Sequence, residues 1–481
     1  MKVGFGVVDI TPRVGVELYG FGPYLNRHSI AVRDRLEARA AAFESAGKRV
    51  VVVGCDLCVI NGGIVARARK LVRAAHPELE DKDILVNASH THSGPSLSVD
   101  YGGWGYPDLP YALLLPARIA RAACAALDAM EEVDYSLGIV PCEHIGLNRV
   151  YDKDAPPLED VLKPDWTPAK PELTDTECRV LKFTRKDGSL AGFVVHFGCH
   201  PVVCCQQCRY IHGDYPAVAI HELMREYPGA VGVFLQGAEG DVNSGCVHKP
   251  EPESMLALDV FAGRFANAVR RGLAAAKPVD DLTIRSFSKI AHFTPDEGFT
   301  LEELDRMEAE NEALFDAPEA TDTDSKLRMA AVNLKGVRDM KAVMARGERP
   351  GTSGEVHGVR LGPVAILGSP FETMQGIRRE VDAAAKAPVP LVTSLCNDTL
   401  GYASDRECGK LDEAGHEAVG DGGTDPDLRE HVVGVLVGGL QIDVQIVEHG
   451  NDHVDDADGP QVAFGVALPV LARIEEGEHA K

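Results

Sequence analysis

The stretch Ile84-Leu85-Val86-Asn87-Ala88-Ser89-His90-Thr91-His92-Ser93-Gly94-Pro95 begins as a hydrophobic strand and ends in two histidines one residue apart, followed by a turn. Imidazoles at positions i and i+2 of an extended chain point to the same side. Small residues after them let a substrate or an ion approach the backbone, and α/β enzymes place their sites at the carboxyl ends of strands. This segment predicts a strand that carries metal ligands. Two ordinary polar histidines at a strand end are the alternative.

A second segment repeats this arrangement. Phe193-Val194-Val195-His196-Phe197-Gly198-Cys199-His200-Pro201 is an apolar strand that ends in an imidazole, and its proline prevents regular continuation. Further loops that combine polar residues with glycine lie at 212–216, 236–243, 367–374 and 397–402. The sequence therefore predicts a site assembled from several loops.

The alternation of strand and helix patterns indicates the fold class. Strand-like runs lie at 50–53, 84–87, 192–197 and 231–235, and helical patterns lie at 111–130 and 217–226. This order predicts an α/β fold, a layered α/β/α domain with a mixed, partly parallel sheet.

A helical insertion is expected at 296–350. Thr300 and Glu303 form a capping-box pattern, and residues 301–346 read as two charged helices. Strands at 355–360, 364–367 and 390–396 then complete the core, and a helix at 428–441 and the terminal segment 462–475 are expected on the outside. We expect residues 1–481 to form a single domain.

Composition excludes some partners. The chain has 481 residues, of which 45% are hydrophobic, and a formal net charge of −24. Because Lys and Arg supply most of the affinity for phosphate backbones, nucleic acid is not an expected partner. No segment is long and apolar enough for membrane insertion, and no signal peptide is evident, so we expect a cytoplasmic protein. The oligomeric state is left open, and a homo-oligomer is one option.

Four of the twelve cysteines crowd one segment: Cys199, Cys204, Cys205 and Cys208. This crowding suits reduced thiols better than a disulfide framework. A soft-metal or redox site is one interpretation. Thiols packed in the core are preferred, because no second Cys-x-x-Cys pair completes a zinc ribbon.

Several motifs in order carry a family resemblance. These are Asp9-Ile10-Thr11-Pro12, the His90–Pro95 motif, Asn148-Arg149, the His200 strand end, Gly213–Pro216, Gly240-Asp241, Pro370-Phe371-Glu372 and Gly401-Tyr402. From about Val3 to Tyr402 the chain resembles the catalytic N-terminal domain of the neutral/alkaline non-lysosomal ceramidase family.

The resemblance implies a zinc-dependent hydrolase of N-acyl amide bonds. It places the metal ligands at His90, His200, Glu372 and Tyr402, with one Zn²⁺ per chain, and sets His92 and Arg149 against the scissile amide. Two imidazoles, a carboxylate and an oxygen donor suit catalytic zinc. Such ligands also serve Mn and Fe, so the sequence leaves the native metal open.

Departures from the family concern the substrate. The family has Gly-Asp-x-Ser-Pro after its fourth strand, whereas this chain has Gly240-Asp241-Val242-Asn243-Ser244. Asn243 and Asp241 are expected to act in catalysis, since an amide can donate to an oxyanion although it cannot be a nucleophile. Either Ser244 replaces the family serine, or metal-activated water attacks without its help. We also expect a compact member without the secretion signal and the C-terminal immunoglobulin-like domain.

These points predict a hydrolase that cleaves an amide or related carbon–nitrogen bond of a small soluble metabolite. One alternative is a ceramidase or another lipid N-acyl hydrolase. Another is a non-catalytic metal-binding protein on the same fold. The amidohydrolase barrel, a further class with His-x-His, is disfavoured because the 301–346 insertion interrupts eight regular β/α units.

Overall fold

The structure is a computed structural model that describes residues 1–97, 103–151, 156–293, 300–348 and 350–404. Its largest sheet has the strand order β11-β9-β8-β6-β1-β3-β4-β5, with β13 also paired to β6. The strands are β1 (Lys2–Asp9), β3 (Glu37–Ser45), β4 (Lys48–Cys55), β5 (Ile84–Ala88), β6 (Glu131–Pro141), β8 (Glu177–Arg185), β9 (Leu190–Phe197), β11 (Val231–Gln236) and β13 (Lys277–Pro278). The β4–β5 and β9–β11 pairs are parallel and the other pairs of this sheet are antiparallel.

The sheet consists of two halves that pack face to face. Only Lys2 and Val3 of β1 pair with Glu132 and Glu131 of β6, so the connection between the halves is narrow. The inner faces share one hydrophobic core, and the backbones meet where a Cβ at Gly54 of β4 would lie 2.4 Å from the Phe234 carbonyl oxygen. A side chain at position 54 would therefore force the halves apart.

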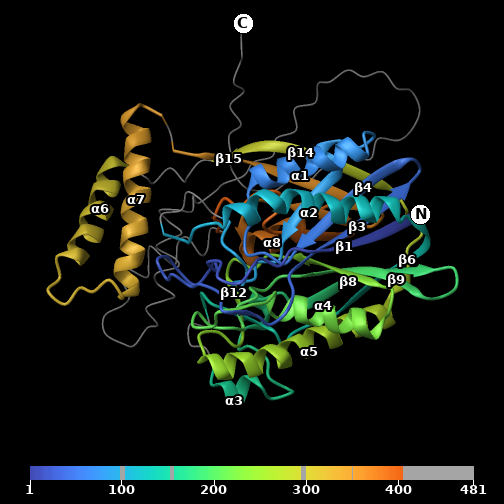
Figure 1. Cartoon of the computed structure of the whole chain (residues 1–481), viewed down its shortest axis with the longest axis horizontal. Coiled ribbons are helices and arrows are strands. Elements are labelled where there is room, and N and C mark those ends of the chain that lie inside the picture. The colour runs from blue at the N-terminus through green and yellow to red at the C-terminus, as the bar shows by residue number, and fades with distance from the viewer. Residues whose placement is uncertain (98–102, 152–155, 294–299, 349, 405–481) are drawn as a thin grey trace, which may run out of the picture.

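Helices cover both outer faces of this pair (Figure 1). The half with β3 and β4 is covered by α1 (Gly62–Ala75) and α2 (Leu109–Asp128), and the half with β8 and β9 by α4 (Asp214–Glu226) and α5 (Glu251–Ala275). Strand alternation causes this layering: Ala40 and Ala42 face the helices, whereas Ala41 and Phe43 face the inner core. The predicted α/β class with a mixed sheet is confirmed. Between the outer helices lie two packed halves of the sheet, where the sequence predicts a single sheet layer.

A four-stranded sheet, β14-β15-β16-β18, joins the inner core through residues such as Val359, Ile366 and Leu391. Its strands are β14 (Ile284–Phe293), β15 (Thr352–Leu361), β16 (Val364–Gly368) and β18 (Val389–Thr393). The short elements are β2 (Ala31–Val32), η1 (Asp81–Asp83), β7 (Gly146–Asn148), α3 (Leu158–Val161), η2 (Pro171–Leu173), β10 (Tyr210–Ile211), β12 (Val242–Ser244), β17 (Glu372–Thr373), α8 (Gln375–Ala384) and β19 (Tyr402–Ala403).

Two helices, α6 (Leu301–Phe315) and α7 (Ser325–Ala345), lie between β14 and β15 in sequence and stand beside the sheets in Figure 1. The Thr300 hydroxyl accepts a hydrogen bond from the Glu303 amide, as the capping pattern predicts. Leu304, Val337 and Met340 form the small core between the two helices. The helix expected at 428–441 and the segment 462–475 lie outside the described residues, so the single-domain boundary of 1–481 stays a prediction.

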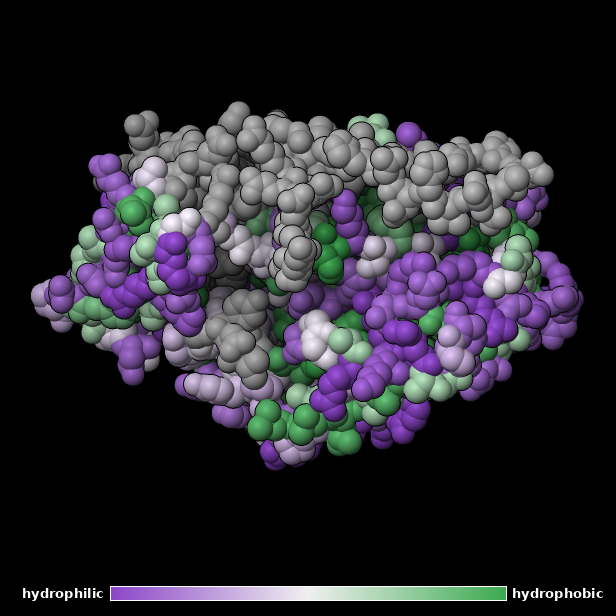
Figure 2. All heavy atoms as spheres, turned by 90° about the horizontal axis from the view of Figure 1, so that it is seen from above, coloured by the Kyte–Doolittle hydropathy of each residue, from purple (hydrophilic) through white to green (hydrophobic). Residues whose placement is uncertain are grey.

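The surface agrees with the charge-rich composition. On the face shown in Figure 2, hydrophilic residues cover most of the described surface and apolar residues form small groups between them. Among the described helices, none combines the length and the hydrophobicity that crossing a bilayer requires.

Candidate metal centre

His90 and His200 follow the carboxyl ends of two strands. His90 comes two residues after β5 and has a positive φ of 70°, and its amide donates to the Leu57 carbonyl at 2.8 Å. His200 comes three residues after β9, and its amide donates to the Val242 carbonyl at 2.8 Å. These backbone bonds hold both imidazoles at the same end of the double sheet, as the sequence predicts for strand-end ligands.

The two imidazoles converge on one carboxylate. The Nε2 atoms of His90 and His200 each lie 3.2 Å from Oε2 of Glu372, and all three side chains are buried. The three residues form a group whose potential ligand atoms lie within 4.8 Å of one another. The structure therefore brings together three of the four predicted ligands around one point.

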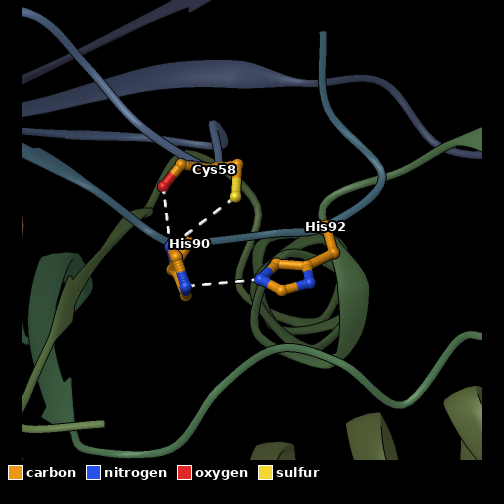
Figure 3. Close-up of side chains that lie close together, drawn as sticks. All are labelled: Cys58, His90 and His92. Atoms are coloured by element: carbon orange, nitrogen blue, oxygen red, sulfur yellow. Dashed lines mark hydrogen bonds between the residues drawn. The ribbon is translucent and has the colours of Figure 1, made fainter. Parts of the chain in front are cut away.

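The far side of each imidazole is fixed by a backbone carbonyl. His90 Nδ1 lies 2.9 Å from the Cys58 carbonyl oxygen (Figure 3), and His200 Nδ1 lies 2.7 Å from that of Glu239. A carbonyl only accepts, so each Nδ1 carries a proton and each Nε2 is the ring nitrogen directed at the shared point. This is how metal-binding histidines are oriented in proteins.

The atoms at the shared point fit a metal ion. His200 Nε2 and Glu372 Oε2 are buried and have no hydrogen-bond partner. Leaving such atoms without a partner costs roughly 1–3 kcal/mol each. A divalent ion with nitrogen and oxygen ligands would satisfy both, so the donor set suits zinc.

Charges around this point shift the pKa of each group. Burial alone would raise the pKa of Glu372, but His90 and His200 hold it well below its ordinary value. Burial and the Arg149 charge lower the pKa of His200 to about 3. For His90, the attraction of Glu372 outweighs burial and raises the pKa well above its ordinary value. A carboxylate and a neutral His200 are the forms that bind metal.

His92 lies beside these ligands. Its Nε2 is 3.3 Å from the Nε2 of His90 (Figure 3), and the edge-on ring of Phe21 packs 4.8 Å from its centroid. Burial, together with the nearby His90 and His200, lowers the pKa of His92 well below its ordinary value. His92 is therefore a neutral imidazole beside the shared point, a form that can accept a proton.

Tyr402 and Arg149 lie next to the Glu372 carboxylate. Tyr402 pairs with Glu372 across the parallel strands β19 and β17, and its hydroxyl interacts with both the Glu372 carboxylate and the Arg149 guanidinium. The Arg149 guanidinium lies over the Tyr402 ring at 5.4 Å and donates to the Gly240 carbonyl. Tyr402 is thus placed where the fourth predicted ligand is expected, and its coordination stays a prediction.

Asp241 lies in the loop that leads from β11 into β12, and Asn243 is the middle residue of β12. The Asp241 carboxylate accepts from Asn148 Nδ2 at 2.8 Å and from the Gln375 amide at 2.8 Å, and its backbone carbonyl accepts from the Arg149 amide at 2.8 Å. These bonds give Asp241 a positioning role, and its catalytic role stays a prediction. Asn243 is 7% exposed and pairs with Leu147 of β7.

The Ser244 hydroxyl is engaged elsewhere. It donates to the Cys246 carbonyl at 2.7 Å, and the residue is fully buried. This bond speaks against Ser244 as a substitute for the family serine.

Sequence reasoning missed the N-terminal loop of the site. Gly20 has a φ of +96°, and a Cβ there would lie 2.4 Å from Cγ of His92. Buried Arg27 donates to the His92 carbonyl at 3.1 Å and to the Cys208 carbonyl at 3.0 Å. The cluster of glycines at 20 and 22 signals an unusual turn, but only the folded chain shows that this turn packs on His92.

Comparisons with known proteins identify relatives of this chain. Residues 1–249 match the family model described as neutral/alkaline non-lysosomal ceramidase, N-terminal. The neutral ceramidase of Pseudomonas aeruginosa is 24% identical over 262 residues, which cover 52% of this chain and 38% of that protein. The neutral ceramidase of Mycobacterium tuberculosis is 22% identical over 294 residues, which cover 57% of this chain and 44% of that protein. The chain spans less than half the length of these relatives.

A solved structure shares the fold. The crystal structure of neutral ceramidase from Pseudomonas aeruginosa superposes with a TM-score of 0.65 and 19% identity, over 93% of this chain and 76% of that one. Glu372 and Tyr402 lie beyond the residues that the family model matches. Since the family model covers half of the sequence, the chain belongs to the neutral/alkaline non-lysosomal ceramidase family.

Proposed function

We propose that this protein is a zinc-dependent hydrolase of amide bonds. The observation that carries the proposal is the convergence of His90 Nε2, His200 Nε2 and Glu372 Oε2, with both Nδ1 atoms anchored on backbone carbonyls. His90, His200 and Glu372 would hold the ion, and Tyr402 would complete the set. When bound, zinc activates water and polarises a carbonyl oxygen.

The protein's own residues would divide the remaining work. His92, neutral because burial and the neighbouring imidazoles lower its pKa, would accept a proton from the attacking water and return it to the departing amine. Arg149 stays charged at neutral pH and would hold the oxygen on which negative charge develops. Asn243 would add an amide donor to the same oxygen.

For the substrate we favour a small soluble N-acyl compound. The support is the replacement of the family serine by Asn243, which changes the donor next to the scissile amide. A ceramide or another lipid amide is the second candidate, supported by relatives that are named neutral ceramidases. The third possibility is a protein that binds metal without catalysis. Turnover of any amide substrate would exclude it.

The test is metal analysis and hydrolysis with matched variants. Wild-type protein, His90→Ala, Glu372→Ala and the control His196→Gln are purified and analysed for zinc, manganese and iron. His196 is a suitable control because it is also a buried strand histidine, but its Nε2 faces the Val392 carbonyl at 2.9 Å. We expect about one zinc per chain in wild type and His196→Gln, and loss of metal and activity in the other two.

A panel of substrates separates the candidates. It runs from acetylated amino acids to short-chain ceramide, and the ratio of kcat/KM values ranks them. Preference for acetylated amino acids supports a small soluble N-acyl compound as the substrate. Preference for ceramide supports a lipid amide as the substrate instead. Zinc without turnover on any member would leave a metal-binding protein, and full metal content in His90→Ala and Glu372→Ala would refute the ligand assignment.

A further inference from the structure

Three sulfur atoms meet at a point outside the zinc site. Cys204 Sγ lies 3.7 Å and Cys208 Sγ 3.9 Å from Sδ of Met255, which belongs to the first turns of α5. The two thiols lie within 4.8 Å of each other. Both cysteines are fully buried, whereas Met255 is half-buried.

His212 is also next to these sulfurs, but its protonation excludes it as a ligand. Its Nδ1 accepts a hydrogen bond from the Asp214 amide at 3.1 Å, so in the neutral imidazole the proton is on Nε2. That Nε2 lies 3.7 Å from Cys208 Sγ and donates toward it. His90 and His200 have the opposite arrangement, with Nδ1 protonated and Nε2 directed at Glu372. The candidate ligands at this second point are therefore all sulfur.

The spacing of the sulfurs suits a bound ion. An ion about 2.3 Å from each sulfur, with bond angles between tetrahedral and trigonal, separates neighbouring sulfurs by about 3.8–4.0 Å. The two distances to Met255 fall close to this range. Two thiolates and a thioether form a soft donor set, which selects Cu⁺ over harder ions. Zinc prefers four ligands and rarely takes a thioether, so three sulfurs serve it poorly.

The surroundings stabilise the thiolate of Cys208, whereas the hydrogen bond to Cys208 and burial raise the pKa of the Cys204 thiol. The positively charged Arg27 guanidinium donates to the Cys208 carbonyl at 3.0 Å, and hydrogen bonds from Cys204 and His212 lower the pKa of the Cys208 thiol. The loop is held by the Asp214 carboxylate, which accepts from the amides of Val203 and Cys204 at 3.3 Å each. One Cu⁺ ion bound by two thiolates has a net charge of −1. The positive charge of Arg27 reduces the free-energy cost of burying that charge.

We propose that Cys204, Cys208 and Met255 bind one Cu⁺ ion in a site made only of sulfur, separate from the zinc site. Binding replaces the protons of the two thiols, which pass to solvent, while the Met255 thioether donates a lone pair without losing a proton. Met255 is the one ligand of the three that is partly exposed to solvent. The sequence analysis preferred thiols that only pack in the core, and the proposal gives two of these four cysteines a metal-binding role instead. This role does not depend on the proposed hydrolase activity.

The test uses the full-length, reduced protein under anaerobic conditions, with the coloured Cu⁺–bicinchoninate complex as the probe. Wild-type protein is expected to withdraw about one Cu⁺ per chain from the complex, and Cys204→Ala/Cys208→Ala to withdraw none. The controls Cys205→Ala and Cys246→Ala remove other buried thiols of the same core and should retain the wild-type stoichiometry. His90→Ala should also retain it, which shows that the copper is not in the zinc site.

Two further variants test the composition of the site. His212→Gln is expected to keep one Cu⁺ per chain, and Met255→Leu, which conserves volume, to weaken Cu⁺ binding at least tenfold. X-ray absorption of the copper-loaded wild type should show sulfur neighbours alone.

Several results would overturn the proposal. These are wild-type protein that withdraws no copper, a Cys204→Ala/Cys208→Ala variant that still does, or nitrogen in the copper shell. Zinc lost from that double variant would instead make this a zinc site. A mass two hydrogens lower in air-exposed wild type, with no copper bound after reduction, would make the pair a redox disulfide. If the double variant does not fold, the wild-type titration, Met255→Leu and the absorption spectrum decide.

Discussion

Glu372 and Tyr402 lie directly opposite each other on the parallel strands β17 and β19. The Glu372 amide donates to the Gly401 carbonyl at 2.8 Å, so the backbone holds the two residues in register. This register brings the phenol to the carboxylate, and the carboxylate in turn faces both imidazoles. The orientation of the carboxylate therefore depends on a strand pair of only two residues on each side.

Replacing Tyr402 by phenylalanine tests this dependence. The change removes one oxygen and keeps the ring under Arg149, so we expect the fold to persist and zinc affinity to fall roughly 10–100-fold. Competition with a zinc chelator measures the affinity. Tyr106→Phe is the control, because Tyr106 is 78% exposed. Unchanged zinc affinity in Tyr402→Phe would show that the hydroxyl neither binds the metal nor orients Glu372.

Gly20→Ala is expected to damage the site through His92. A Cβ at position 20 would lie 2.4 Å from the imidazole, so the ring must move, and kcat should fall at least tenfold while zinc is retained. Gly22→Ala separates this contact from backbone strain, because Gly22 has a similar φ of +106° and nothing within 4 Å of the added carbon. Both variants should lose about 1 kcal/mol of stability from strain. Equal kcat values for the two variants would contradict the prediction.

The strand-end histidines and the α/β class were predictable because their signals are local. An apolar run that stops at His90 or His200 is visible within ten residues. The doubling of the sheet was not, because it depends on the contact between Gly54 and Phe234, which are far apart in sequence. The role of Asp241 was also hidden, since its partners Asn148 and Gln375 lie 93 and 134 residues away.

The ligands Glu372 and Tyr402 came from the family resemblance and not from spacing. Nothing in a single sequence indicates that the short strands β17 and β19 pair with each other. Residues 405–481 lie outside the described residues, so the structure does not test what the sequence predicts for them. The tautomer of His212 decides whether its Nε2 is a metal ligand or a hydrogen-bond donor. This tautomer likewise depends on where the Asp214 amide points. Such details follow from tertiary contacts alone.

Asn243→Ala tests whether this amide replaces the family serine. If Asn243 donates to the developing oxyanion, kcat should fall roughly 10²–10³-fold with zinc content unchanged. Ser244→Ala is the matched variant, because the Ser244 hydroxyl is used by the Cys246 carbonyl. It should cost about 1 kcal/mol of stability and leave kcat within twofold of wild type. A large loss of kcat in Ser244→Ala alone would reverse the assignment.

Glu239 makes stability depend on pH in the metal-free protein. Burial raises the pKa of its carboxyl to about 8, whereas in the unfolded chain it titrates near 4.5. Between these values the unfolded state holds fewer protons, so Glu239 lowers the free energy of unfolding by about 1.4 kcal/mol per pH unit as pH rises. Glu239→Gln keeps the shape and removes this titration. Urea unfolding at several pH values from 5 to 8.5 should therefore show a stability gain for Glu239→Gln that grows up to about pH 8 and then stays level. A gain independent of pH would mean that the carboxyl titrates normally and that water reaches it, because only burial gives the rising difference.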